Sequence, residues 1–128
     1  MPNILLGKRP EHFAPVAVKF KTPDGRDFAI QDVVFKYRTR KEFAALVDSA
    51  TEQHQFKQDP DAPFQLGKLF EVADARSAKL MAESLVSWGI DASVTPQTIE
   101  QLIDETPAAF TALWDAYSQA ARDGRLGN

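Results

Sequence analysis

The sequence contains no cysteine. This absence excludes disulfide bridges, thiolate metal sites and cysteine nucleophiles, and it is compatible with a reducing cytoplasm. Histidine is scarce as well, with two residues in 128. Neither His12 nor His54 has a second histidine or a carboxylate at a spacing typical of metal ligands. We therefore predict that both are surface residues and that the protein has no metal site.

Long hydrophobic runs are also missing. The N-terminus carries three consecutive apolar residues, Ile4 to Leu6, whereas the apolar core of a secretory signal needs about 7–15. No run approaches the ~20 apolar residues of a membrane-spanning helix. We therefore expect neither a signal peptide nor a membrane-spanning segment.

The sequence lacks the common catalytic signatures too. It contains no GxSxG, P-loop or GxGxxG motif. Glu100, Asp104 and Glu105 form its nearest approach to a carboxylate cluster, but this pattern is more typical of a solvated acidic helix face. Asp59-Pro60-Asp61 is typical of a turn. We therefore predict no catalytic residues and no cofactor, and hence a protein that is not an enzyme.

What is present is an ordinary globular composition, with 44% apolar and 26% charged residues. A length of 128 residues is close to the commonest size of one domain. We predict a single domain over 1–128. Its N-terminal segment 1–13 is expected to be mobile, and prolines predict a loop over about 51–65.

The charge is unevenly distributed. The net charge is -3, with ten Lys/Arg against nine Asp/Glu in residues 1–64 and five against nine in residues 65–128. Such a balance argues against a general nucleic-acid binder. The densest basic cluster lies between Lys36 and Lys41, and a small nucleic-acid-binding regulator that uses this patch remains an alternative.

Residues 16–20 alternate between apolar and polar, which is typical of a half-buried strand. A Pro-Asp-Gly sequence at 23–25 is suited to a tight turn, and an apolar face resumes at 28–30. The sequence therefore predicts an antiparallel β-hairpin over about 15–38.

The parity of the apolar positions changes within the second strand. They are even-numbered up to Ile30 and odd-numbered over 33–37. A regular strand would send these two sets to opposite faces. We predict a β-bulge near 31–32 that restores a single face. The alternative is a strand that is covered on both sides over its second half.

Helical patterns follow the hairpin. Thr39-Arg40-Lys41-Glu42 is a capping box, and it predicts a helix over about 40–52 with one apolar stripe. Thr95-Pro96 and Thr106-Pro107 are helix-start signals. Further apolar spacing predicts helices over about 65–73, 75–88, 96–104 and 107–123. Asp74 is a candidate N-terminal cap for the helix over 75–88, and Gly89 is suited to cap its C-terminal end. The first two could instead be one kinked helix. The predicted fold is α+β, a hairpin followed by four to five helices.

Two groups of residues are candidates for binding a partner protein. One is the basic end of the first helix, because Arg and Tyr are common interface anchors. The other is the aromatic face of the last helix, which could accept a partner helix but could equally belong to the core. The candidate residues are Arg38, Arg40, Lys41, Phe110, Trp114 and Tyr117.

Several motifs, taken in order, resemble those of a known family. They are GKRP at 7–10, the VKFKTPDG hairpin, the FKYRTRKEFAALVD passage, Trp88-Gly89 and the terminal GRLGN. Together they resemble the tail assembly chaperones of siphophage-type bacteriophages and prophages. The resemblance extends over most of the chain.

This resemblance implies a non-enzymatic role in the host cytoplasm. Such chaperones bind the long helical tape measure protein and help to recruit tail tube subunits around it. They are expected to self-associate and to be absent from the mature virion. A structural minor tail protein is an alternative from the same biology.

Overall fold

The structure, a computed structural model, describes residues 6–53 and 60–124. His54, Asp59 and the last four residues of the chain lie outside the described residues. The elements in order are β1 (Val16–Lys21), β2 (Asp27–Phe35), α1 (Arg40–Gln53), α2 (Leu66–Ser84), β3 (Leu85–Ser87), α3 (Pro96–Glu105) and α4 (Pro107–Asp123). The predicted α+β class is confirmed, with a third strand that the sequence pattern did not indicate.

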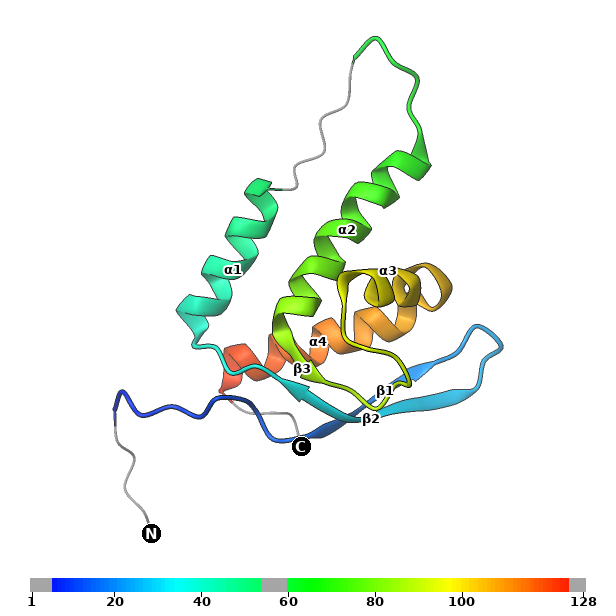
Figure 1. The fold of residues 1–128 in the computed structure, drawn as a ribbon. Helices are drawn as coiled ribbons and strands as arrows, with labels where there is room; N and C mark the ends of the chain where they lie inside the picture. The colour runs from blue at the N-terminus through cyan, green and yellow to red at the C-terminus, as the bar shows by residue number, and fades with distance from the viewer. Residues whose placement is uncertain (1–5, 54–59, 125–128) are drawn as a thin grey trace.

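The three strands form one antiparallel sheet in the order β1-β2-β3. The helices lie on one side of this sheet, and α1 and α2 rise away from it (Figure 1). Apolar side chains from both layers meet between the sheet and the helices. The largest fully buried side chains are those of Tyr117, Phe35, Met81, Ile99, Leu113, Val33 and Ser84.

The predicted β-bulge is confirmed. Two residues of β2, Gln31 and Asp32, oppose the single residue Ala17 of β1. Asp32 has a φ of 54°, in the left-handed region that aspartate tolerates better than most residues. The extra residue returns Val33 to the face of Ile30, and both side chains are buried. The second strand therefore keeps one apolar face.

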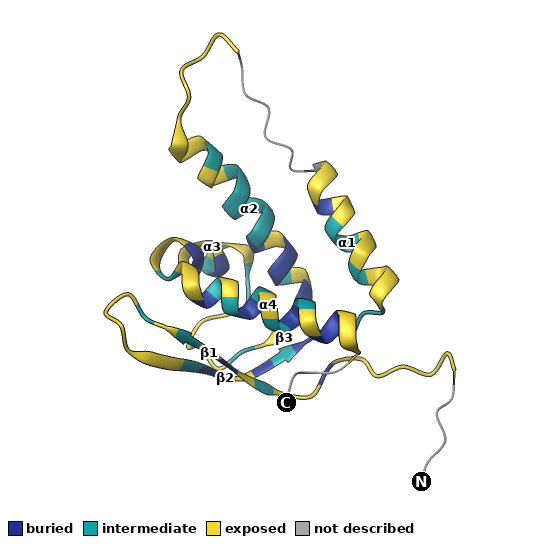
Figure 2. Cartoon of the chain, turned by 180° about the vertical axis from the view of Figure 1, so that it is seen from behind, coloured by how far each residue is buried: buried dark blue, intermediate teal, exposed yellow. Residues whose placement is uncertain are grey.

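The helices predicted over 65–73 and 75–88 are one helix, α2, which ends at Ser84. Asp74 therefore lies inside a helix and is not a cap. The residues that follow form β3, which pairs with the end of β2. Figure 2 shows that α2 passes from exposed residues at its start to buried residues near the sheet. The sheet supplies hydrogen-bonding partners there, since the Lys36 N–H donates to the Ser84 carbonyl at 2.8 Å.

Gly89 has a different role from the predicted helix cap. A Cβ atom at this position would lie 2.5 Å from the carbonyl oxygen of Gln31. The backbone after β3 therefore passes directly against the bulge in β2. Only glycine permits so close an approach.

The N-terminal segment, predicted to be mobile over 1–13, is docked at its C-terminal end. The Phe13 N–H donates to the Phe35 carbonyl at 2.9 Å, and the Tyr37 N–H donates to the Glu11 carbonyl at 3.1 Å. Phe13 is buried and its ring centroid lies 5.2 Å from that of Tyr37. This pairing attaches residues 11–13 to the end of β2. The loop predicted from residue 51 also begins later, because α1 continues to Gln53.

Two helices begin at the predicted Thr-Pro pairs, but the two threonines differ. The Thr98 N–H donates to Thr95 Oγ1 at 3.2 Å, and the Thr95 N–H donates to Thr98 Oγ1 at 3.1 Å. This reciprocal pair caps α3. The Thr106 side chain makes no capping hydrogen bond at the start of α4. The same Thr-Pro signal therefore stabilises the start of α3 through a side-chain cap but not the start of α4.

We expect Thr95→Ala to lower the free energy of unfolding by about 1 kcal/mol, because it removes a capping oxygen. Thr106→Ala is the matched control, with an expected loss below about 0.5 kcal/mol. Urea unfolding of the two variants and the parent chain measures both values. Equal losses at the two sites would contradict the assignment of the cap to Thr95 alone.

Asp74 is half-buried in the middle of α2. Burial raises the pKa of its carboxyl group above the ordinary value of 3.8, and the Asp104 carboxylate raises it further. Because the raised pKa belongs to the folded state, the contribution of Asp74 to stability is complete below pH 3.8. It is lost as the pH rises through the raised value. At neutral pH the charged group is thus unfavourable.

We expect Asp74→Asn to be more stable than the parent chain at pH 7 and equally stable near pH 3, where the carboxyl group is protonated. The gain is small because the group is only half-buried. Asp104→Asn removes the neighbouring charge and should therefore give part of the same gain in stability at pH 7. Unfolding curves recorded across this pH range give the difference, and a gain that persists unchanged at pH 3 would rule out this titration as its cause.

Candidate partner-binding surface

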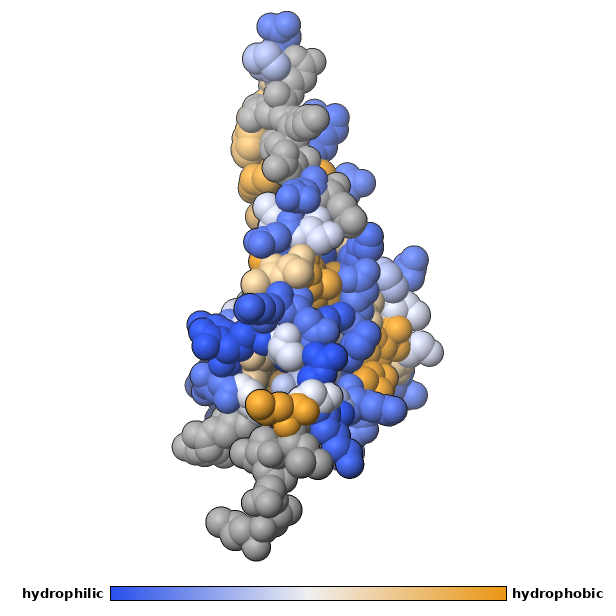
Figure 3. All heavy atoms as spheres, turned by 90° about the vertical axis from the view of Figure 1, so that its left-hand side faces the viewer, coloured by the Kyte–Doolittle hydropathy of each residue, from blue (hydrophilic) through white to orange (hydrophobic). Residues whose placement is uncertain are grey.

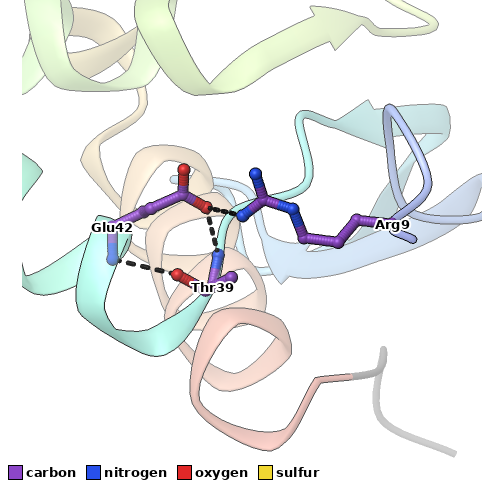
Figure 4. Close-up of polar contacts among 3 residues, drawn as sticks. All are labelled: Arg9, Thr39 and Glu42. Carbon is purple, nitrogen blue, oxygen red and sulfur yellow. Dashed lines mark hydrogen bonds and ion pairs between the residues drawn. The ribbon is translucent and has the colours of Figure 1, made fainter. Parts of the chain in front are cut away.

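The first turn of α1 is fixed by a three-residue network (Figure 4). The Thr39 N–H donates to Glu42 Oε1 at 2.9 Å, and the Glu42 N–H donates to Thr39 Oγ1 at 3.2 Å. This confirms the predicted capping box. Arg9 from the N-terminal segment donates to the same Glu42 oxygen at 2.8 Å. The Thr39 N–H lowers the pKa of Glu42, and Arg9 lowers it further.

Arg38, which precedes this box, is a bridge between three elements. Its Nη1 donates to Ser84 Oγ at 3.0 Å and to the Tyr117 hydroxyl at 2.8 Å. Its Nη2 donates to the Glu83 carbonyl at 3.0 Å. The guanidinium carbon also lies 6.0 Å from the centre of the Tyr117 ring. A residue between β2 and α1 thus ties the end of α2 to α4.

The position of Arg38 suits the end of a helix. The last carbonyl groups of α2 have no partners within the helix and carry partial negative charge. Ser84 Oγ donates to the Leu80 carbonyl at 2.7 Å. Arg38 donates to the Glu83 carbonyl, and the Lys36 N–H donates to the Ser84 carbonyl. Arg38 therefore acts as a helix C-cap supplied from another element.

The aromatic face of α4 packs largely against the rest of the fold. Tyr117 is 0% exposed, with its ring centroid 5.2 Å from that of Phe35. Phe43 of α1 packs against Trp114 and Tyr117, with its ring centroid 5.7 Å from each of theirs. Phe110 and Trp114 are half-buried. In this structure Tyr117 belongs to the core, while Phe110 and Trp114 keep part of their surface accessible.

An open groove lies between α1 and the C-terminal end of α4, and we call it the α1–α4 groove. Phe43, Ala44 and Val47 give it an apolar floor, and three of its other lining residues are cationic. The lining residues are Arg40, Lys41, Phe43, Ala44, Val47, Asp48 and Arg122. Figure 3 shows that hydrophobic patches on the α1 side of the molecule are separated by hydrophilic residues.

The candidate residues therefore fall into three groups. Arg40 and Lys41 are exposed and line the groove. Arg38 is half-buried and contacts the buried Tyr117, and Phe110 and Trp114 lie outside the groove lining. Sequence analysis missed Arg122, which lies 81 to 82 positions further along the chain than the two cations it joins. Only the fold brings the three charges together.

Other kinds of site find little support in the described part of the chain. Among residues 6–53 and 60–124, no group of three histidine, cysteine or acidic side chains could hold a metal ion. No helix within these ranges is long and apolar enough to cross a membrane. The basic patch from Lys36 to Lys41 is divided, because Arg38 is engaged with Tyr117 and Ser84.

Comparison with known proteins agrees with the resemblance seen in the sequence. No curated protein and no solved structure matches the chain. A family model described as phage tail assembly chaperone matches residues 1–128. This match covers the full length of the sequence, so the chain belongs to the phage tail assembly chaperone family.

Proposed function

We propose that this protein is a non-catalytic chaperone that binds the tape measure protein during tail assembly and helps to recruit tail tube subunits around it. It would act in the host cytoplasm and be absent from the finished virion. The observation that carries the proposal is the α1–α4 groove, an apolar surface bordered by cations on a member of a chaperone family.

The groove has the features that an amphipathic helix needs. Phe43 and Val47 are one helical turn apart and are both half-buried, so each leaves apolar surface accessible. A partner helix presents apolar side chains at i, i+3, i+4 and i+7, which can pack on such a surface. Arg40, Lys41 and Arg122 would attract acidic residues that border the apolar row of the partner.

Coexpression with the tape measure protein tests the proposal. We expect the parent chain to keep most of the tape measure protein in the soluble fraction. The double variant Arg40→Glu/Lys41→Glu should lose most of this effect, because it reverses the charge at the groove. Acidic residues are favourable in the first turn of a helix, so the variant should still fold.

Lys19→Glu/Lys68→Glu is the matched control, because both lysines are exposed and neither lines the groove. It changes the net charge equally and should leave solubilisation intact. If the tape measure protein aggregates to the same extent with and without the parent chain, the chaperone proposal fails. Mass spectrometry of purified virions separates it from a structural tail protein, which should be present there.

A further inference from the structure

A second apolar depression lies on another part of the molecule, where the hairpin extends beyond the helices. Phe20 and Phe28 form one wall, and Ile90 and Leu102 form the other. A smaller depression beside Trp88 shares Ile90, Leu102 and Thr106 with it, so the two are continuous. We call this surface the hairpin–α3 groove. It shares no lining residue with the α1–α4 groove.

The walls of this groove are held in place and leave large apolar side chains accessible. Phe28 is 56% exposed, and its ring centroid lies 5.6 Å from that of Phe20. The Trp88 Nε1–H donates to the Ala92 carbonyl at 2.7 Å, which fixes the indole. The surface is therefore formed before any partner arrives, which reduces the entropy lost on binding.

The charged residues that line this groove are of one sign, whereas Lys19 and Lys21 lie in a separate depression that shares Phe20 and Phe28 with it. Between Lys79 and Arg122 the sequence has six Asp/Glu residues and no Lys or Arg. Two of the six, Asp91 and Glu105, line the groove. The described residues that line its two depressions include no cation. A groove bordered by one sign of charge attracts ligands of the opposite sign and repels others.

We propose that the hairpin–α3 groove is a second docking surface, and that its occupant is a protein segment whose apolar side chains are bordered by Lys and Arg. Its charge is opposite to that of the α1–α4 groove. A segment complementary to one groove is thus repelled by the other. This proposal is independent of the proposed function, because neither Arg40 nor Lys41 takes part in it.

Fluorescence titration with synthetic peptides tests the proposal. The chain has two tryptophans, and Trp88 lines the groove. Trp114→Phe therefore leaves Trp88 as the only fluorescent indole of the chain. We expect a helical peptide of Leu and Lys to change the Trp88 emission saturably. A peptide of Leu and Glu with the same spacing should leave the emission unchanged. A Leu/Lys peptide that gives no saturable change overturns the proposal.

Charge variants distinguish the groove from general attraction to an acidic protein. In the Trp114→Phe background, Asp91→Lys/Glu105→Lys should weaken Leu/Lys peptide binding about tenfold and flatten its salt dependence. Glu71→Lys/Asp115→Lys makes the same change in net charge outside the groove, and should weaken binding less than about twofold. Equal weakening by the two double variants overturns the proposal.

Apolar variants provide a second, independent comparison. Phe28→Ser and Phe70→Ser replace side chains that are equally exposed, at 56% each, but only Phe28 lines the groove. Phe28→Ser should weaken peptide binding at least about fivefold, whereas Phe70→Ser should leave it unchanged. Peptide binding that survives Phe28→Ser unchanged counts against the groove as the docking surface.

Discussion

Replacing Arg38 with alanine is expected to lower the free energy of unfolding by about 3 kcal/mol. The substitution removes three charge-assisted hydrogen bonds and leaves the Glu83 carbonyl without its cation. It also removes the positive charge from the C-terminal end of α2, where such charge is favourable. Urea unfolding followed by far-ultraviolet circular dichroism measures the loss.

Arg40→Ala is the matched control, because Arg40 is exposed two positions further on. We expect it to change stability by less than about 0.5 kcal/mol. Arg38→Lys should be less destabilising than Arg38→Ala but still less stable than the parent chain. A single ammonium group cannot donate to all three acceptors, which are arranged to suit the planar guanidinium group. A double-mutant cycle with Tyr117→Phe isolates the bond to the hydroxyl. If Arg38→Ala proves no more damaging than Arg40→Ala, the bridge is not a stabilising feature.

Gly89→Ala is expected to be nearly as damaging, with a loss of about 2–3 kcal/mol. The added methyl group would lie 2.5 Å from the Gln31 carbonyl oxygen and 3.1 Å from its carbon. Both atoms belong to the backbone, so the contact cannot be relieved by a change of rotamer. Either the bulge in β2 or the segment after β3 must move. Thermal and urea unfolding both report the cost.

Gly67→Ala is an informative control, because a Cβ atom there meets nothing within 4 Å. Gly67 lies in the first turn of α2, and alanine should stabilise the helix by about 0.5 kcal/mol. The two glycine substitutions should therefore act in opposite directions. A neutral result for Gly89→Ala would contradict the close approach of these two backbone segments.

The parts of the fold that sequence analysis predicted are those with a local cause. The hairpin follows from alternation and a turn sequence, and even the bulge at Gln31 and Asp32 follows from a change of parity between neighbours. The Thr39 and Thr95 caps depend on residues three positions apart. In each case the residues that decide the structure lie within a few positions of one another.

The end of α2 and the existence of β3 have a distant cause. Helical spacing continues beyond Ser84 in the sequence, so no local pattern marks the end of the helix there. The backbone of Lys36 and the side chain of Arg38 bind the final carbonyl groups, and Arg38 is 46 positions from Ser84. A strand of three residues also leaves too short a pattern to detect.

Distant contacts also explain why sequence analysis predicted only part of the candidate surface. The sequence marks Arg38, Arg40 and Lys41 as equivalent members of a basic cluster. The fold separates them, because Arg38 reaches Tyr117 while the other two line the α1–α4 groove. Side-chain chemistry is visible in a sequence, whereas the identity of a neighbour 79 residues away is not.

The bond between Arg38 and Tyr117 also has a consequence for the order of events during synthesis. Its two residues are 79 positions apart, and a nascent chain must expose both before the contact can form. Until α4 has left the ribosome, Phe35 and Phe43 lack the ring against which they pack. The hairpin and α1 are made first, but closure of the core waits for one of the last helical turns. A ribosome that pauses before Tyr117 should therefore hold a chain that proteases still cleave within β2 and α1.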